Sequence, residues 1–99
     1  MLLKRLLLAE EVVMETLTLR LNGVTTVATL TRVQHKSRAA YWVLTWLPDA
    51  PLALRTQGAR VFAATEAALV WLQGQGESGA SLWRDGELVV PARRAEGAA

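Results

Sequence analysis

His35 is the only histidine in the chain, so it is the first residue to consider for acid–base chemistry. Histidine is the side chain most often used as a general base because its charge changes near neutral pH. His35 lies in a basic polar segment, residues 34–38, with no neighbouring acid and no serine or cysteine nucleophile motif. We therefore interpret it as a solvated loop residue, and we expect the protein not to be an enzyme.

The carboxylates that could form a paired acid–base site are spread along the chain. They stand mostly where turns and helix ends are expected, and local structure accounts for them there: Asp49, Glu66, Glu77, Asp85 and Glu87. The glycine-rich segment 74–79 resembles a phosphate-binding loop, but it follows a predicted helix and has no lysine after its last glycine. The chain has no cysteine, which excludes disulfides and zinc sites built on thiolates. We expect no metal, no cofactor and no small-molecule ligand.

Cations and aromatic side chains gather in the middle of the chain. Residues 20–60 contain six lysines and arginines against one acid, whereas residues 61–99 contain more acids than cations. Cations bind phosphates and aromatic rings stack on unpaired bases. We therefore expect a nucleic-acid-binding surface made of Arg20, Arg32, His35, Lys36, Arg38, Tyr41, Arg55 and Arg60. The alternative is that Trp42 and Trp46 belong to the core and the cations form a solvated rim, and the small net charge of +2 favours this alternative.

A β-hairpin centred on Asn22-Gly23 is the most specific structural signal. This dipeptide supplies the two positive-φ residues of a type I′ turn, and it lies between the alternating runs 16–21 and 24–31. A two-residue loop predicts three pairs on the core face: Leu21 with Val24, Leu19 with Thr26, and Leu17 with Ala28. It predicts three pairs on the opposite face: Arg20 with Thr25, Thr18 with Val27, and Thr16 with Thr29. The second face is only half polar, so we expect a partner or a second subunit on it.

Two more strands are expected in the next part of the chain. Residues 39–47 predict a third strand that is apolar on both faces, which is typical of a central strand or of one covered by a partner. Residues 52–55 predict a short fourth strand.

The clearest helix begins near Thr65, which we expect to be its N-cap, with Glu66 in the first turn. It ends at Gly74 or Gly76, and its expected anchors are Phe62, Leu69 and Leu72. Asp85-Gly86, between residues 80–84 and 87–90, predicts a second hairpin.

These elements predict an α+β fold: an antiparallel meander of three to four strands, one helix packed on it and a short C-terminal hairpin. We expect one domain over residues 14–90 and a disordered tail over residues 91–99. Residues 1–13 form an N-terminal leader that is either a short helix, an extension of the first strand, or untranslated sequence before a start at Met14. The apolar stretch 6–9 is too short for export, and we expect a cytoplasmic protein with no membrane contact.

The spacing Arg60-x-Phe62-x-x-Thr65-x-x-Ala68-x-x-x-Leu72 resembles the strand–helix segment of small uncharacterised proteins encoded on bacterial plasmids and other mobile elements. The resemblance covers residues 59–74, and Ala64 replaces a threonine expected nearer Phe62. It implies a bacterial accessory protein and assigns no active-site residue. The predicted order of strands and helix is also similar to small single-stranded-DNA-binding and coactivator domains that dimerise, which is an analogy of fold alone.

The hydrophobic fraction of 52% and the four tryptophans exceed what a lone domain of 99 residues buries easily, which favours a homodimer over an ordinary apolar monomer. We expect a non-enzymatic binding module whose partners are a second copy of itself and DNA or RNA. The alternative is a protein-interaction or structural accessory protein that does not bind nucleic acid.

Overall fold

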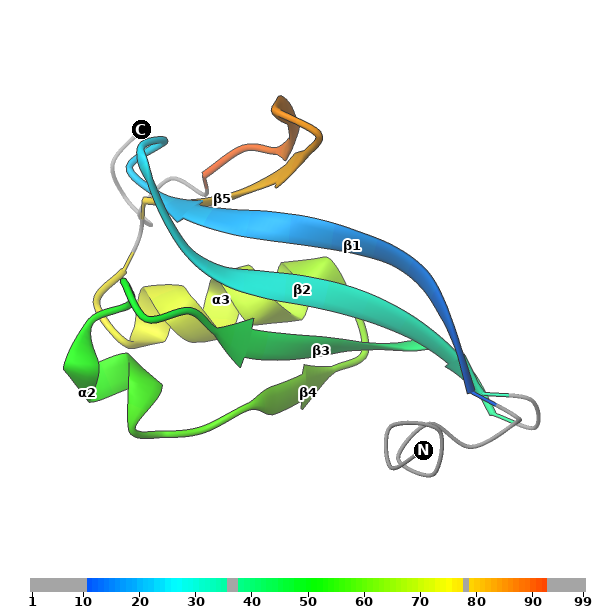
Figure 1. Cartoon of the computed structure of the whole chain (residues 1–99). Helices are drawn as coiled ribbons and strands as arrows, with labels where there is room; N and C mark the ends of the chain where they lie inside the picture. Colours follow the sequence, from blue (N-terminus) through cyan, green and yellow to red (C-terminus); the bar gives the residue numbers. More distant parts are fainter. Residues whose placement is uncertain (1–10, 36–37, 78, 93–99) are drawn as a thin grey trace.

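The computed structural model describes residues 11–35, 38–77 and 79–92, which form an α+β fold (Figure 1). Its strands, all antiparallel, make one six-stranded sheet with the order β4-β3-β2-β1-β5-β6. The strands are β1 (Glu11–Leu21), β2 (Thr25–His35), β3 (Tyr41–Trp46), β4 (Arg60–Phe62), β5 (Ala80–Arg84) and β6 (Glu87–Val90); the helices are α2 (Leu52–Arg55) and α3 (Thr65–Gly74). The predicted class is confirmed. The sheet is larger than expected because the C-terminal hairpin joins it through β5.

The turn between β1 and β2 has the predicted geometry. Asn22 and Gly23 have φ values of 55° and 71°, and the Val24 N–H donates to the Leu21 carbonyl at 3.1 Å. The predicted register is wrong, however. Leu21 pairs with Thr25, and a second one-residue shift at Val27 pairs Leu19 with Ala28 and Leu17 with Leu30.

From Ala28 onward the two register shifts preserve the predicted faces of β2. Between the shifts the prediction is wrong, because Thr25 pairs with Leu21 and Thr26 with Arg20. Each one-residue slip moves side chains to the other face of a sheet, so two slips restore the original alternation. Leu17 and Leu19 are buried, and Leu21 packs against the same core, as the core-face prediction requires. Val27 stands at the second shift and is buried in the core cluster, although we expected it on the opposite face.

The core lies between one face of the sheet and the helices. Its fully buried large side chains come from five elements and are mostly leucines: Leu17, Leu19, Val27, Leu30, Leu44, Leu69, Leu72 and Leu82. Burying a leucine contributes about 1.5–3 kcal/mol. Trp42, Trp46, Phe62 and Trp71 pack around this cluster, so the tryptophans of β3 are core residues, as in the alternative interpretation of the basic segment.

The element after β3 differs from the prediction. β3 lies between β2 and β4, so its central position is confirmed, but residues 52–55 form α2 instead of a strand. The N–H groups of Leu54 and Arg55 both donate to the Pro51 carbonyl at 3.0 Å, and the buried Leu54 holds this turn against the core. Leucine, alanine and arginine are good helix formers, and four residues are too few for their alternation to identify a strand.

Helix α3 and the second hairpin are close to their predicted positions. The N-cap of α3 is Ala64, with φ −150° and ψ 158°, so the prediction of Thr65 as N-cap is wrong by one residue. The helix ends at Gly74, and its Leu69 and Leu72 are buried as expected. Asp85 and Gly86 have φ values of 52° and 83° in the predicted turn between β5 and β6.

Residues 11–13 extend β1, where Val12 pairs with Gln34 and Val13 with Val33. Residues 1–10 of the expected leader and residues 93–99 of the expected tail lie outside the described residues.

Candidate functional site

The sheet has two unlike faces. The covered face carries the leucines of β1, β2 and β3 and packs against α3 and α2. The opposite face, here called the open face, follows from the register and from strand alternation: Val13, Thr16, Thr18, Arg20, Thr26, Thr29, Thr31, Val33, Tyr41, Val43, Thr45, Val61, Ser81, Trp83 and Leu88. Neither described helix packs on this face.

Threonines occupy the centre of the open face. Thr16 pairs with Thr31, and Thr29 pairs with both Thr18 and Thr45 across three adjacent strands. Threonine favours strands because its branched Cβ fits the pleated surface, and its hydroxyl is both a donor and an acceptor. The centre is therefore a regular array of small groups that can form hydrogen bonds, with little net charge.

Apolar side chains lie at the rim of the open face. Val61 on β4 is 63% exposed, Leu88 on β6 is 50% exposed and Val13 on β1 is 49% exposed. Val61 pairs with Val43, Leu88 with Trp83, and Val13 with Val33. Val61 and Leu88 belong to the two terminal strands, so these apolar side chains stand at separate points around the threonine centre and do not form one contiguous patch.

Arg20 and Trp83 form a packed corner of the open face. The Arg20 guanidinium carbon lies 4.2 Å from the centre of the Trp83 ring, and the Trp83 Nε1–H donates to the hydroxyl of Ser81 at 2.9 Å. The Arg20 Nε is buried and has no hydrogen-bond partner among the described residues. This corner therefore joins β1 to β5 by a cation–π contact that fixes the position of the cation.

The residues predicted to bind nucleic acid do not form one surface. Arg20 and Tyr41 lie on the open face, whereas Arg32 and Arg60 lie on the covered face. Arg55 is the last residue of α2, and its Nε donates to the Ala50 carbonyl at 3.0 Å.

The remaining predicted residues belong to the connection between β2 and β3. His35 ends β2, and Arg38 is exposed, with its N–H donating to the His35 carbonyl at 3.2 Å. Lys36 lies outside the described residues. This connection is at the opposite end of β2 from the Asn22-Gly23 turn, beside which Arg20 lies.

Several of these cations are held by contacts within the chain. Arg60 lies over Trp71, 4.4 Å from the ring centre, as Arg20 lies over Trp83. Arg32 forms an ion pair with Glu15 at 4.0 Å. A cation and a ring face that are already in contact with each other are less available to a phosphate or a base.

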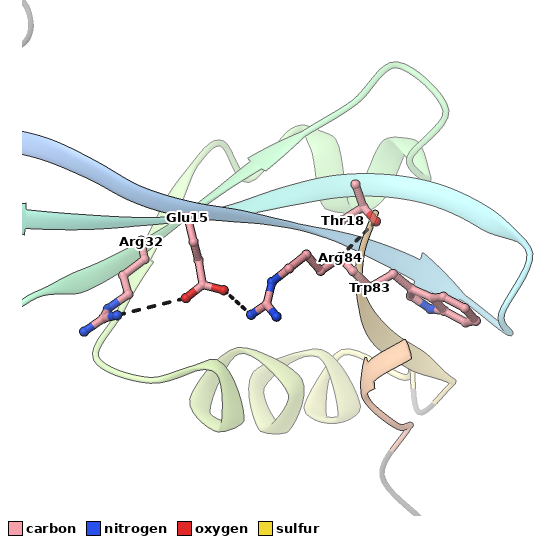
Figure 2. Close-up of polar contacts among 5 residues, drawn as sticks. All are labelled: Glu15, Thr18, Arg32, Trp83 and Arg84. Carbon is pink, nitrogen blue, oxygen red and sulfur yellow. Dashed lines mark hydrogen bonds and ion pairs between the residues drawn. The ribbon is translucent and has the colours of Figure 1, made fainter. Parts of the chain in front are cut away.

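Glu15 joins two strands to β1 on the covered face. Figure 2 shows its carboxylate between the guanidinium groups of Arg32, from β2, and Arg84, from β5, with an ion pair to each. Glu15 and Arg84 were not among the site residues predicted from the sequence. The available signal was that Glu15 continues the alternation of Leu17, Leu19 and Leu21, so it is a charge at a core-face position that requires a partner.

The described residues contain no pocket, and they contain no group of three or more histidine, cysteine or acidic side chains placed to hold a metal ion. Neither of the helices within residues 11–35, 38–77 and 79–92 has the length and apolar character needed to cross a membrane.

Comparisons of the chain with models of known protein families, with curated proteins and with solved structures find no match.

Proposed function

We propose that the protein is a non-enzymatic binding module that works as a homodimer and binds a protein partner on its open face. The observation that carries this proposal is the composition of that face, where a threonine centre is surrounded by the exposed Val13, Val61 and Leu88. Such a surface offers hydrogen bonds and apolar contact over an extended area, which suits a folded protein surface better than a small ligand.

The charges support a protein partner over nucleic acid. Arg20 is the one cation among the described residues of the open face, and it is stacked on Trp83. Binding to a nucleic acid backbone rests on several cations on one surface. Arg32, Arg55 and Arg60 lie elsewhere and have contacts within the chain.

Nucleic acid is the second candidate, and one observation favours it. Tyr41 and Trp83 share the open face with Arg20, and a sheet that presents aromatic rings with a cation can stack unpaired bases. Phosphate contacts make affinity fall steeply with salt, whereas apolar contact with a protein changes little. Salt dependence therefore separates the two candidates.

The test of the open face uses a double variant, Val61→Ser with Leu88→Ser, and a control variant, Val24→Ser. Val24 is 78% exposed but belongs to the turn between β1 and β2. The wild type and both variants are immobilised, and each is used to capture proteins from an extract of the cells in which the chain is naturally produced. We expect a partner that the wild type and the control retain and the double variant loses. Equal retention by all three would contradict the proposal.

A fluorescence titration completes the test. Short single- and double-stranded DNA is added to the wild type at low and at high salt. We expect no saturable binding at either salt concentration. Saturable binding that is strong at low salt and lost at high salt would favour the nucleic-acid candidate instead.

A further inference from the structure

Within the part of the chain that the structure describes, the outer edge of β1 is unpaired over most of its length. β1 has 11 residues and four of them, residues 18–21, pair with β5, which leaves seven, residues 11–17, without a strand paired to them on that side among the described residues. Figure 1 shows this part of β1 running beyond β5 together with β2. The outward N–H and C=O groups of such an edge form a ready template for another strand.

The two terminal strands of the sheet are protected by their length. β4 has three residues and β6 has four, and short edge strands are one of the ways in which proteins avoid unwanted pairing. The free part of β1 is longer than either. It is therefore the edge of this sheet best able to form a continuous ladder with another strand.

The described side chains along the free part of β1 are largely apolar or uncharged. Val12, Val13 and Met14 are all about half exposed, and they follow one another on the free part of β1. Charged side chains usually protect an edge, but the Glu15 carboxylate is engaged by Arg32 and Arg84 on the covered face. The one charge in this part of the edge whose side chain is described is thus neutralised within its own chain.

We propose that the occupant of this edge is the β1 strand of a second copy, paired antiparallel across a two-fold axis near Val12 and Val13. Such an interface is isologous, so one strand edge serves both subunits and the apolar group 12–14 meets its own copy. The register irregularity between Val13 and Glu15 bends β1, so the axis lies on the N-terminal side of Met14. This pairing rests on the homodimer in the proposed function and identifies its interface.

The pairing has a consequence for the open face. Two six-stranded sheets joined through β1 become one continuous sheet, and the open faces of the two subunits lie side by side on it. The partner surface proposed above is then doubled without any change within a subunit. Val13 contributes to the rim of that face and stands at the junction.

Single cysteines test the pairing directly because the chain has none of its own. Val12→Cys and Val13→Cys are compared with Val24→Cys, Val61→Cys and Leu88→Cys, whose parent residues are all about half exposed or more. Under mild oxidation of dilute protein, we expect covalent dimers to form several-fold faster at positions 12 and 13 than at the three controls. Equal or faster crosslinking at position 61 or 88 would overturn the proposal, because those residues are on the terminal strands.

Charged substitutions supply a second test that does not depend on crosslinking. Light scattering of the wild type should give the mass of a dimer, and Val13→Lys and Val13→Glu alone should each give that of a folded monomer. An equimolar mixture of the two variants should restore the dimer, since opposite charges then meet at the axis. Val24→Lys is the control and should stay dimeric, while far-ultraviolet circular dichroism checks that each variant is folded.

The two proposals fail in different ways. A wild type that is monomeric at micromolar concentration overturns the β1 pairing, whatever the open face binds. If the wild type is a dimer and Val61→Ser with Leu88→Ser captures the same proteins as the wild type, the open-face proposal is contradicted. The crosslinking result then decides whether β1 forms the dimer interface. Variants at Val13 that remain dimeric also overturn the β1 pairing.

Discussion

The Arg20 guanidinium lies over the Trp83 ring at 4.2 Å, which ties the second hairpin of the chain to the first. Arg20 is on β1 and pairs with Ser81, while Trp83 is on β5 and pairs with Thr18. The Thr18 hydroxyl also donates to the Trp83 carbonyl at 3.4 Å (Figure 2). The corner thus combines ladder hydrogen bonds, a side-chain hydrogen bond and a cation–π contact at the point where β5 joins the sheet.

We predict that Arg20 and Trp83 are energetically coupled. A double-mutant cycle with Arg20→Ala and Trp83→Ala should give a coupling free energy of about 0.5–2 kcal/mol, the range of cation–π contacts from exposed to desolvated sites. Urea unfolding followed by circular dichroism measures it without relying on tryptophan fluorescence. The control cycle, Arg60→Ala with Trp83→Ala, should show no coupling because Arg60 stacks on Trp71. Equal coupling in both cycles would show that the contact has no specific role.

Arg20→Met should destabilise the protein less than Arg20→Ala. Methionine retains most of the apolar stem that packs on Trp83, and it removes the buried Nε that has no hydrogen-bond partner among the described residues. The two variants are compared by their urea midpoints. A larger loss for methionine than for alanine would contradict this account of the corner.

Another prediction concerns the close approach of Gly79 to the Asn22 turn. The Asn22 N–H donates to the Gly79 carbonyl at 2.8 Å, and a Cβ on Gly79 would collide with the side-chain oxygen of Asn22. The Asn22 side chain has to rotate away to admit this Cβ, so Gly79→Ala should cost about 1 kcal/mol of unfolding free energy. Gly74→Ala is the matched control, since its Cβ meets no atom within 4 Å, and it should be neutral or stabilising.

The collision at Gly79 can be relieved from the other side. Asn22→Gly removes the obstructing side chain and keeps a residue that adopts the observed φ of 55° easily. The double variant should recover most of the stability that Gly79→Ala loses. If the double variant is no more stable than Gly79→Ala, the lost stability comes from the backbone of residue 79 and not from its contact with Asn22.

The turns could be predicted because their chemistry is local. Asn22-Gly23 and Asp85-Gly86 both show the positive φ values that their residue types favour. The register of β1 with β2 could not be predicted, because the shift at Val27 depends on packing between strands and the residues of the turn do not indicate it. The face assignment of Leu17 and Leu19 was still correct because alternation along β1 does not depend on the register, and Ala28 shares their face because the two shifts cancel.

The candidate nucleic-acid residues were grouped by nearness along the chain, and nearness along a strand does not place residues on one face. Strand alternation within the hairpin already places Arg32 on the covered face, with the leucines, and Arg20 on the open face. What the sequence could not supply was the partner of each cation. Trp83 is far from Arg20 in the sequence, and Trp71 lies on α3 whereas Arg60 lies on β4. Each cation meets its ring only in the folded chain.

A further prediction tests the packing of the core on β3. Leu44 is fully buried and pairs with Leu30 on one side and Arg60 on the other. Leu44→Ala should cost about 2–5 kcal/mol, because the cavity adds to the lost transfer free energy. In a domain of this size such a loss is a large part of the total stability. Val24→Ala, at an exposed turn position, is the control and should change the urea midpoint little.

The last prediction concerns Glu15 as the acid shared by two arginines. Glu15→Gln removes the charge that balances Arg32 and Arg84 and leaves two cations close together on the covered face. Ion pairs that are partly exposed contribute about 0.2–1 kcal/mol each, so we expect a loss of about 0.5–2 kcal/mol for the pair of contacts. The loss should shrink at high salt, where charges are screened. Asp49→Asn, in the exposed segment after β3, is the control and should be nearly neutral. An equal effect at both positions would show that general charge balance, and not this cluster, sets the stability.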